Sequence, residues 1–284
     1  MEIALALPAP AKLNLFVRIT GRRADGYHEL QSAFALIDLA DLIDFERRGD
    51  GVIQREGDLI GAAENDLAVR AANALKKFSD TSHGVTISVS KRIPAGSGLG
   101  GGSSDAATTL LALNRLWDLH LPREQLSTIG LQLGADVPFF LHGRNALAEG
   151  IGERLTTIEL PAAWYAIVWP NVHVSTKDIF ADEGLTRNSK AMKIAPFSEA
   201  DSVLPAGNDL EPVARRRYPV IDEAIKRLEQ HGENAGAARM TGSGSAVFLA
   251  MHSQAQAQAA IFDLPSGWQS WVARGLSEHP LAAW

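Results

Sequence analysis

Residues 94–105 of this 284-residue chain read Pro94-Ala95-Gly96-Ser97-Gly98-Leu99-Gly100-Gly101-Gly102-Ser103-Ser104-Asp105. The five glycines in this stretch let the backbone take positive φ angles and approach a ligand closely. Successive N–H groups can then form a concave site for an anion. The residues that follow predict a helix over 104–116, whose N-terminal amides would face the same site. Ser103 and Ser104 add hydroxyls for phosphate oxygens or Mg²⁺, so the stretch predicts a polyphosphate site.

Other glycine-rich patterns compete with this interpretation. Gly96, Gly98 and Gly101 have the spacing of a dinucleotide-binding fingerprint. The acidic residue that the fingerprint needs about 20 residues later would be Asp118, which lies at the end of a predicted helix. A P-loop would need Gly-Lys followed by Ser or Thr, and the stretch has none. A flexible surface turn is disfavoured, because a serine-capped helix follows the glycines directly.

Strands and helices are mixed along the rest of the chain. The first half predicts strands at 12–19, 32–45 and 85–89, and helices at 65–78, 104–116 and 122–134. The second half predicts a strand at 165–169, a helix at 176–182, a helical region from 208 to 228, a helix at 255–262 and a last strand at 268–273. Asn65 and Asn208 are the predicted helix caps. Residues 184–206 show no periodicity and predict an irregular segment.

Composition narrows the class of protein. The net charge is −6, which is unlike the basic footprint of a nucleic-acid binder. The chain has no cysteine, which excludes disulfides and thiolate chemistry. The first residues lack the pattern of a signal peptide, and there is no apolar run long enough for a spanning helix. We therefore expect a cytoplasmic protein that binds neither nucleic acid nor membrane.

Two more stretches support a phosphate-transfer site. They read Pro10-Ala11-Lys12-Leu13-Asn14-Leu15 and Met240-Thr241-Gly242-Ser243-Gly244-Ser245-Ala246-Val247-Phe248. With the glycine-rich stretch between them, they resemble, in the right order, the three motifs of the GHMP kinase superfamily.

Four further segments narrow the resemblance to one family. They are Gly26-Tyr27-His28-Glu29-Leu30, Gly134-Ala135-Asp136-Val137-Pro138-Phe139-Phe140, Gly150-Ile151-Gly152-Glu153 and Asn208-Asp209-Leu210-Glu211. Together they resemble the diphosphocytidyl-methylerythritol kinases of non-mevalonate isoprenoid biosynthesis. The resemblance covers roughly residues 8–251, with no family motif in 184–206 or after 252.

The resemblance implies an α+β, two-domain GHMP kinase fold. Residues 1–155 would form an ATP-binding domain like ribosomal protein S5 domain 2. Residues 156–284 would form a ferredoxin-like α/β substrate domain, whose last strand could return to the first domain. The active site would lie in the cleft between them. The implied reaction moves the γ-phosphoryl of ATP, with Mg²⁺, to the 2-hydroxyl of a substrate that carries a cytidine diphosphate group. The metal ligands stay unassigned, and a monomer or homodimer is expected.

Two residues carry the implied catalysis. Asp136 is the candidate base that accepts the hydroxyl proton, and Lys12 would hold its carboxylate and polarise the hydroxyl. Without the resemblance, Asp136 would be read as a cap of a helix or turn, and Lys12 as a solvent-facing strand lysine.

The remaining site residues divide between nucleotide and substrate. The resemblance assigns ATP binding to Pro94, Ala95, Gly96, Ser97, Gly98, Leu99, Gly100, Gly101, Gly102, Ser103 and Ser104. It assigns substrate binding to Asn14, Tyr27, His28, Asp136, Phe180, Gly242, Ser243 and Gly244. Tyr27 and Phe180 would sandwich the cytosine ring, and His28 would bond its edge. From the residues alone, Phe180 reads as core, His28 as a surface histidine and 242–244 as a tight turn.

Three alternatives stay open at this point. The first is a GHMP kinase for mevalonate-type, homoserine or sugar alcohols, against which Gly26-Tyr27-His28 argues. The second is a dinucleotide-dependent oxidoreductase. The third is a non-catalytic nucleotide-binding module, against which Lys12 and Asp136 argue.

Overall fold

The computed structural model describes residues 3–59, 61–192, 207–232 and 237–284. Its strands are β1 (Ile3–Arg22), β2 (His28–Arg48), β3 (Ile53–Gly57), β4 (Gly84–Ser90), β5 (Ala146–Gly150), β6 (Arg154–Thr157), β7 (Trp164–Trp169), β8 (Arg239–Met240), β9 (Val247–Met251) and β10 (Gln269–Leu276). Its helices are α1 (Leu67–Ser79), α2 (Gly101–Leu116), α3 (Arg123–Leu133), α4 (Val137–His142), α5 (Thr176–Ala181), α6 (Glu211–Arg217), α7 (Pro219–Glu229) and α8 (Gln254–Ala260). A 3-10 turn at Ala63–Asn65 precedes α1. This mixture confirms the predicted α+β class.

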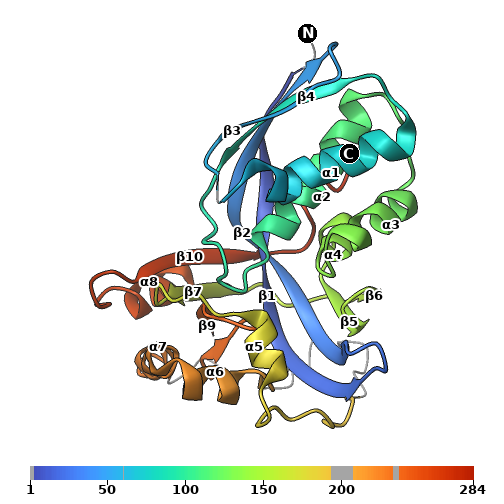
Figure 1. The fold of residues 1–284 in the computed structure, drawn as a ribbon. Coiled ribbons are helices and arrows are strands. Elements are labelled where there is room, and N and C mark those ends of the chain that lie inside the picture. The colour runs from blue at the N-terminus through green and yellow to red at the C-terminus, as the bar shows by residue number, and fades with distance from the viewer. Residues whose placement is uncertain (1–2, 60, 193–206, 233–236) are drawn as a thin grey trace.

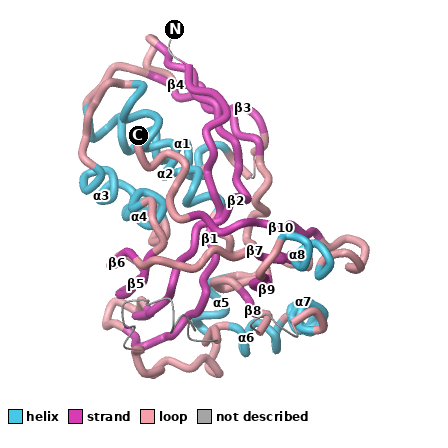
Figure 2. Tube along the Cα trace, turned by 180° about the vertical axis from the view of Figure 1, so that it is seen from behind, coloured by secondary structure: helices cyan, strands magenta, loops and turns pink. Residues whose placement is uncertain are grey.

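Two long antiparallel strands, β1 and β2, form the spine of the molecule. Figure 1 shows them running from the end that carries α1–α4 to the end beside α5 and α6, and Figure 2 shows the same arrangement from behind. The ten-stranded sheet has the order β3-β4-β2-β10-β7-β9-β8, with β1 and β5 also paired to β2. The last strand, β10, pairs with β7 along its length and with β2 at Gly275 and Leu276. One sheet therefore connects both halves of the chain.

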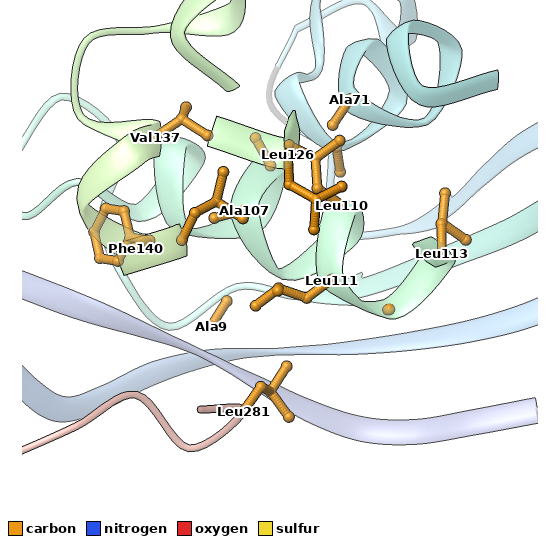
Figure 3. Close-up of a cluster of buried hydrophobic side chains, with 14 of the residues drawn as sticks. Ala9, Ala71, Ala107, Leu110, Leu111, Leu113, Leu126, Val137, Phe140 and Leu281 are labelled. Atoms are coloured by element: carbon orange, nitrogen blue, oxygen red, sulfur yellow. The ribbon is translucent and has the colours of Figure 1, made fainter. Parts of the chain in front are cut away.

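The core consists of three buried hydrophobic clusters. The first lies between helices α1–α4 and the sheet, and Figure 3 shows Leu110 and Leu111 of α2 in it with Phe140 of α4. Leu281 belongs to the same cluster, so the segment after β10 completes the core of the first half. The second cluster joins α5–α8 to the face of β7 and β9, and the third lies where β1 and β2 cross the second half. No helix among the described residues is both long and apolar enough to cross a membrane.

Strand β1 departs from its prediction in an informative way. The alternation over 12–19 predicted a half-buried strand, but every residue from 7 to 17 except Pro8 is buried. Leu13 and Leu15 point into the third cluster, whereas Lys12 and Asn14, which alternate with them, are 4% and 6% exposed on the opposite face. The strand is covered on both faces, so its polar residues line an interior space instead of contacting solvent.

The predicted helix caps, Asn65 and Asn208, lie one and two residues before the observed caps, Asp66 and Leu210. Asp66, not Asn65, caps α1, because its side chain accepts the N–H of Ala68 at 2.8 Å. Asn208 accepts the N–H of Leu210 at 2.9 Å, and α6 begins only at Glu211. Helix α2 starts earlier than predicted, at Gly101, inside the glycine-rich stretch.

The other predicted elements agree with the structure within a few residues. Residues 184–192 are irregular, as predicted, and 193–206 lie outside the described residues. The proposed domain division between 155 and 156 stays a prediction, since β10 of the second half pairs with a strand of the first.

Candidate active site

The glycine-rich loop lies between β4 and α2 and is held by both halves of the chain. The N–H of Lys12 donates to the carbonyl of Leu99 at 2.9 Å, and the N–H of Ala246 donates to the carbonyl of Ser97 at 2.9 Å. These bonds anchor the loop to β1 and to the segment before β9. Because α2 begins at Gly101, its first N–H groups, which have no partner within the helix, belong to the loop itself. This is a suitable site for phosphate groups.

Two glycines of the loop cannot be replaced without strain. Gly98 has a φ of 82°, and a Cβ there would lie 2.4 Å from the carbonyl oxygen of Thr241. Gly100 has a φ of 78°, and its Cβ would lie 3.0 Å from the ring of Phe140 and 3.1 Å from the side chain of Lys12. Side chains other than glycine are disfavoured at such φ angles. The backbone of the loop therefore packs directly against Thr241, Phe140 and Lys12, with no room for a side chain at these two glycines.

A cavity of about 360 Å³ opens over this loop. Residues 94–98 and 100–103 line it, together with Arg55, Lys91 and Asp105. Leu99 and Ser104, also predicted to bind ATP, are fully buried and are not among its described lining residues. Five of the lining residues are glycines, at which the backbone itself borders the cavity, and this suits a ligand recognised through its phosphates.

Lys91 lies beside the loop between two buried carboxylates. Its Nζ contacts Asp41 and lies 2.7 Å from Asp105. Burial, opposed by Lys91, raises the pKa of Asp105. Burial disfavours the charged lysine, but the carboxylates of Asp105 and Asp41 outweigh it and raise the pKa of Lys91. Asp41 also accepts the N–H of Ile93 at 2.8 Å, so the cluster fixes the chain where it enters the loop.

A larger cavity, of about 650 Å³, adjoins the first. Ser103 lines both, so the start of α2 separates them. Lys12, Asn14 and Asp136 line the larger cavity near this junction, and Tyr27, His28 and Phe180 also line it. A group transferred from one cavity to the other would pass close to Lys12 and Asp136.

Lys12 and Asp136 form an ion pair inside this space. Lys12 Nζ lies 3.4 Å from Asp136 Oδ2, donates to Asn14 Oδ1 at 2.5 Å, and lies 5.0 Å from the ring centre of Phe34. The lysine side chain is 5% exposed, so the interpretation as a solvent-facing lysine was wrong. Asn14 is held in turn by Thr241, whose Oγ1 accepts the Asn14 N–H at 2.9 Å.

Asp136 occupies the position before α4, with its side chain free of the helix. The helix begins Val137-Pro138, and no capping hydrogen bond from the Asp136 side chain is found among the described residues. The carboxylate is 34% exposed and faces Lys12. The capping role considered from the sequence is therefore wrong, and the carboxylate is available to a ligand.

The far end of the larger cavity is aromatic. The rings of His28 and Phe180 lie 5.0 Å apart at 33°. Tyr27 is 61% exposed in the turn between β1 and β2, whose shape depends on Gly26 at a φ of 91°. Burial, with the positive charges of Arg187 and Arg22, lowers the pKa of His28. Phe180 packs on the second cluster and also lines the cavity, so the core and ligand interpretations are compatible.

The third motif closes the larger cavity from the second half of the chain. Gly242 and Ser243 line it, and Ser243 Oγ lies 2.7 Å from Thr176 Oγ1. Asn208 Nδ2 donates to the carbonyls of Met240 at 2.9 Å and Gly242 at 2.7 Å. Gly244 is not among the described lining residues. Residues 242–244 also form the turn between β8 and β9, which confirms the tight turn predicted from the residues alone.

Comparisons with known proteins agree with this geometry. Residues 66–144 match the model of the GHMP kinases N-terminal domain, and residues 188–269 match that of the GHMP kinases C-terminal domain. A 4-diphosphocytidyl-2-C-methyl-D-erythritol kinase of Burkholderia cenocepacia (strain HI2424) is 52% identical over 97% of this chain and 95% of its own length. The chain belongs to the 4-diphosphocytidyl-2-C-methyl-D-erythritol kinase family of GHMP kinases.

Solved structures of GHMP kinases share its fold. A crystal structure of 4-(cytidine 5'-diphospho)-2C-methyl-D-erythritol kinase is 34% identical, with a TM-score of 0.82 over 96% of this chain and 99% of that chain. A homoserine kinase from Cytophaga hutchinsonii ATCC 33406, at 18% identity, has a TM-score of 0.68 over 98% of this chain and 96% of that one. The homoserine kinase shows the fold alone. The two-domain GHMP kinase fold is thereby confirmed, and the oxidoreductase alternative was wrong.

Sequence reasoning missed several polar residues around the site of this GHMP kinase. They are Asp41, Lys91, Asp105, Arg187 and Asn208. Asp41 had only a shared signal, because it is one of three aspartates, with Asp38 and Asp44, in the otherwise apolar stretch 36–45. Lys91 and Arg187 had none, because surface lysines and arginines are common and only tertiary contacts distinguish these two. No group of three or more His, Asp or Glu side chains that could hold a metal ion is found in the described part of the chain.

Proposed function

We propose that this protein transfers the γ-phosphoryl group of ATP to the 2-hydroxyl of 4-diphosphocytidyl-2-C-methyl-D-erythritol, a step of non-mevalonate isoprenoid precursor biosynthesis. The observation that carries the proposal is the junction of the two cavities. A loop-lined cavity suited to phosphates adjoins a larger one, and the Lys12–Asp136 pair lies near the junction. The names of relatives that match the chain over nearly its whole length support this substrate.

Asp136 and Lys12 act on the attacking hydroxyl in this proposal. Phosphoryl transfer depends on positioning and on charge stabilisation, with a residue that orients the nucleophile or accepts its proton. The Asp136 carboxylate accepts the proton of the substrate 2-hydroxyl. Lys12, 3.4 Å away, keeps that carboxylate in place and presents positive charge to the incoming phosphoryl group. Asn14, bonded to Lys12, positions the lysine and contacts the substrate near the transferred group.

The loop amides and the start of α2 bind the phosphates of ATP in this proposal. When bound, Mg²⁺ would neutralise negative charge on the phosphates during transfer. Mg²⁺ usually takes only one or two carboxylates besides phosphate oxygens and water. The residues fit that requirement, since Asp105 lines the nucleotide cavity and its Oδ1 has no hydrogen-bond partner among the described residues. Asp105 and the hydroxyl of Ser103 would hold the ion.

The aromatic end of the larger cavity binds the cytosine ring. Tyr27 and Phe180 stack on its two faces, and such stacking contributes about 1–3 kcal/mol per base in nucleic-acid complexes. His28 bonds the polar edge, and Gly242 and Ser243 contact the substrate from the other side. In the structure the rings of Phe180 and His28 lie 5.0 Å apart, and both residues line the cavity that the base would enter. We infer a cytoplasmic enzyme, because its reaction consumes ATP. A monomer or homodimer stays the expectation for its oligomeric state.

A substrate comparison tests the proposal. Purified protein is incubated with ATP and Mg²⁺, and ADP release is followed with the cytidine substrate, mevalonate, homoserine and galactose. We expect turnover with the cytidine substrate alone. Turnover with one of the other alcohols would keep the GHMP kinase chemistry but reject the cytosine site. Binding of ATP without turnover on any of them would reject the proposed reaction.

A further inference from the structure

Arg187 joins the two sides of the aromatic end of the larger cavity. It lies in the irregular segment after α5, which Figure 1 shows in yellow passing beneath the end of the β1–β2 hairpin. Its Nε donates to His28 Nε2 at 3.1 Å. Its Nη2 donates to the carbonyls of Phe180 at 3.0 Å and Asp182 at 2.8 Å, and Nη1 to that of Leu185 at 3.2 Å. One guanidinium thus fixes both His28 and the backbone that carries Phe180.

The direction of the Arg187–His28 hydrogen bond determines where the proton of His28 lies. A guanidinium has donors and no acceptor, so His28 Nε2 must be the acceptor. A neutral imidazole with an accepting Nε2 carries its proton on Nδ1. Arg187 and Arg22, which is paired with His28 across the β1–β2 ladder, disfavour a second proton on His28. The acidic groups that line the same cavity are Asp25 and Asp136. His28 is therefore held neutral, with Nδ1–H as its one ring donor.

A single fixed donor distinguishes pyrimidine bases. The edge of cytosine presents N3 and O2 as acceptors, whereas the N3 of uracil carries a hydrogen and is a donor. A donor facing N3 of cytosine makes a hydrogen bond, but facing N3 of uracil it leaves two donors opposed and unpaired. Sites that are built to hydrogen-bond one partner reject the mismatched one strongly, because buried polar groups are left unsatisfied.

We propose that Arg187 is a positioning residue that fixes the Nδ1–H tautomer of His28 and thereby makes the larger cavity select cytosine over uracil. The inference rests on the proposed function only in placing a pyrimidine base beside His28. Arginine is required at this position, because its planar fork serves the ring nitrogen and three carbonyls together. A lysine ammonium cannot span the same set in one geometry.

The tautomer is measured first, without any nucleotide. The protein is labelled with ¹⁵N-histidine, and the ring nitrogens of His28 are assigned from the spectrum of His28→Gln. In the wild-type protein at pH 7.5 we expect the Nδ1–H form of His28. In Arg187→Met we expect a mixture of tautomers and a pKa that rises toward the ordinary value. An unchanged tautomer in Arg187→Met would overturn the inference, whatever the protein phosphorylates.

The selectivity is measured next by calorimetric binding of CDP and UDP. We expect the wild-type protein to prefer CDP, and we expect Arg187→Met to reduce the ratio of the two affinities by about 10- to 100-fold. A lost tautomer preference with an unchanged ratio would also overturn the inference. Because CDP and UDP binding does not depend on phosphoryl transfer, failure of the kinase reaction would be seen separately in the ADP-release assay.

Arg216→Met is the matched control. Arg216 pairs with Asp182 on the same segment, at 2.5 Å, and has no described contact with His28. We expect this variant to keep both the tautomer and the CDP preference, and a loss of either would assign the effect to general loosening of the segment. If Arg187→Met does not fold, Arg187→Lys keeps the positive charge, and we expect it to lose the tautomer preference as well.

Discussion

His279 ties the segment after β10 to the first half of the molecule, and its titration can be measured as stability. The residue is 1% exposed, its N–H donates to the carbonyl of Gly143 at 2.8 Å, and its Nδ1 accepts the N–H of Leu281 at 3.0 Å. Burial, with the nearby charge of Arg123, lowers the pKa of His279 from 6.5 to about 4. The unfolded chain therefore binds a proton between these values that the folded protein does not.

The sign and size of the effect follow from this pKa difference. Above pH 6.5 neither state is protonated at His279, and its contribution to stability is fully present. As the pH falls from 6.5 to about 4, the unfolded state gains a proton and the contribution is lost. A difference of about 2.5 pKa units, at about 1.4 kcal/mol per unit, corresponds to about 3 kcal/mol in total. About 2 kcal/mol of this is lost between pH 7 and pH 4.5.

The replacement His279→Asn isolates this contribution. The Asn Oδ1 can accept the Leu281 N–H in place of Nδ1, but it does not titrate in this range. Urea unfolding of both proteins is followed by tryptophan fluorescence at several pH values from 7 to 4.5, so that the carboxylates common to both proteins cancel in the difference. We expect the wild-type protein to lose about 2 kcal/mol more than the variant over this range. A difference in unfolding free energy that does not change with pH would refute the reasoning.

Three further predictions concern the two cavities. Asp136→Asn should lower kcat by about 10²- to 10⁴-fold with little change in ATP affinity, and near-normal turnover in the folded variant would remove its proposed role as a base. Lys91→Met leaves two buried carboxylates without their cation, so thermal or urea unfolding should show a loss of about 3–5 kcal/mol, and adding Asp105→Asn should recover part of it. Gly98→Ala places a Cβ 2.4 Å from the carbonyl of Thr241 at a φ of 82°, so it should cost at least about 1–2 kcal/mol and weaken ATP binding measured by calorimetry. Unchanged ATP affinity in a stable Gly98→Ala protein would show that the loop does not bind the phosphates.

Local features of this site could be predicted from the sequence, because local backbone chemistry determines them. The five glycines in residues 94–105 predicted a loop followed by a helix start, and the structure places both beside a cavity. The position of Lys12 in β1 was predicted, but its burial was not, because the alternation of a strand does not reveal what covers its second face.

Contacts distant in sequence could not be predicted in the same way. Lys91 and Asp41 are 50 residues apart, and Arg187 and His28 are 159 apart. The sequence around Lys91 and the sequence around Arg187 do not distinguish these two residues from solvated surface residues. Asn208 was predicted to be a helix cap on its residue type, whereas its amide holds the third motif. These contacts follow from how the strands and loops pack in three dimensions, which hydrophobic periodicity does not specify.

The path of β10 has a consequence for folding during synthesis. Residues 275 and 276 pair with residues 37 and 36, and Leu281 fills the core formed by α1–α4. The ribosome makes the first half of the chain well before these residues, at about 5–20 residues per second. For that interval the nascent first half has one unpaired edge of β2 at residues 36 and 37 and an unfilled core, both of which attract other chains. A chaperone that shields this stretch should raise the yield of native protein more than one that acts after release.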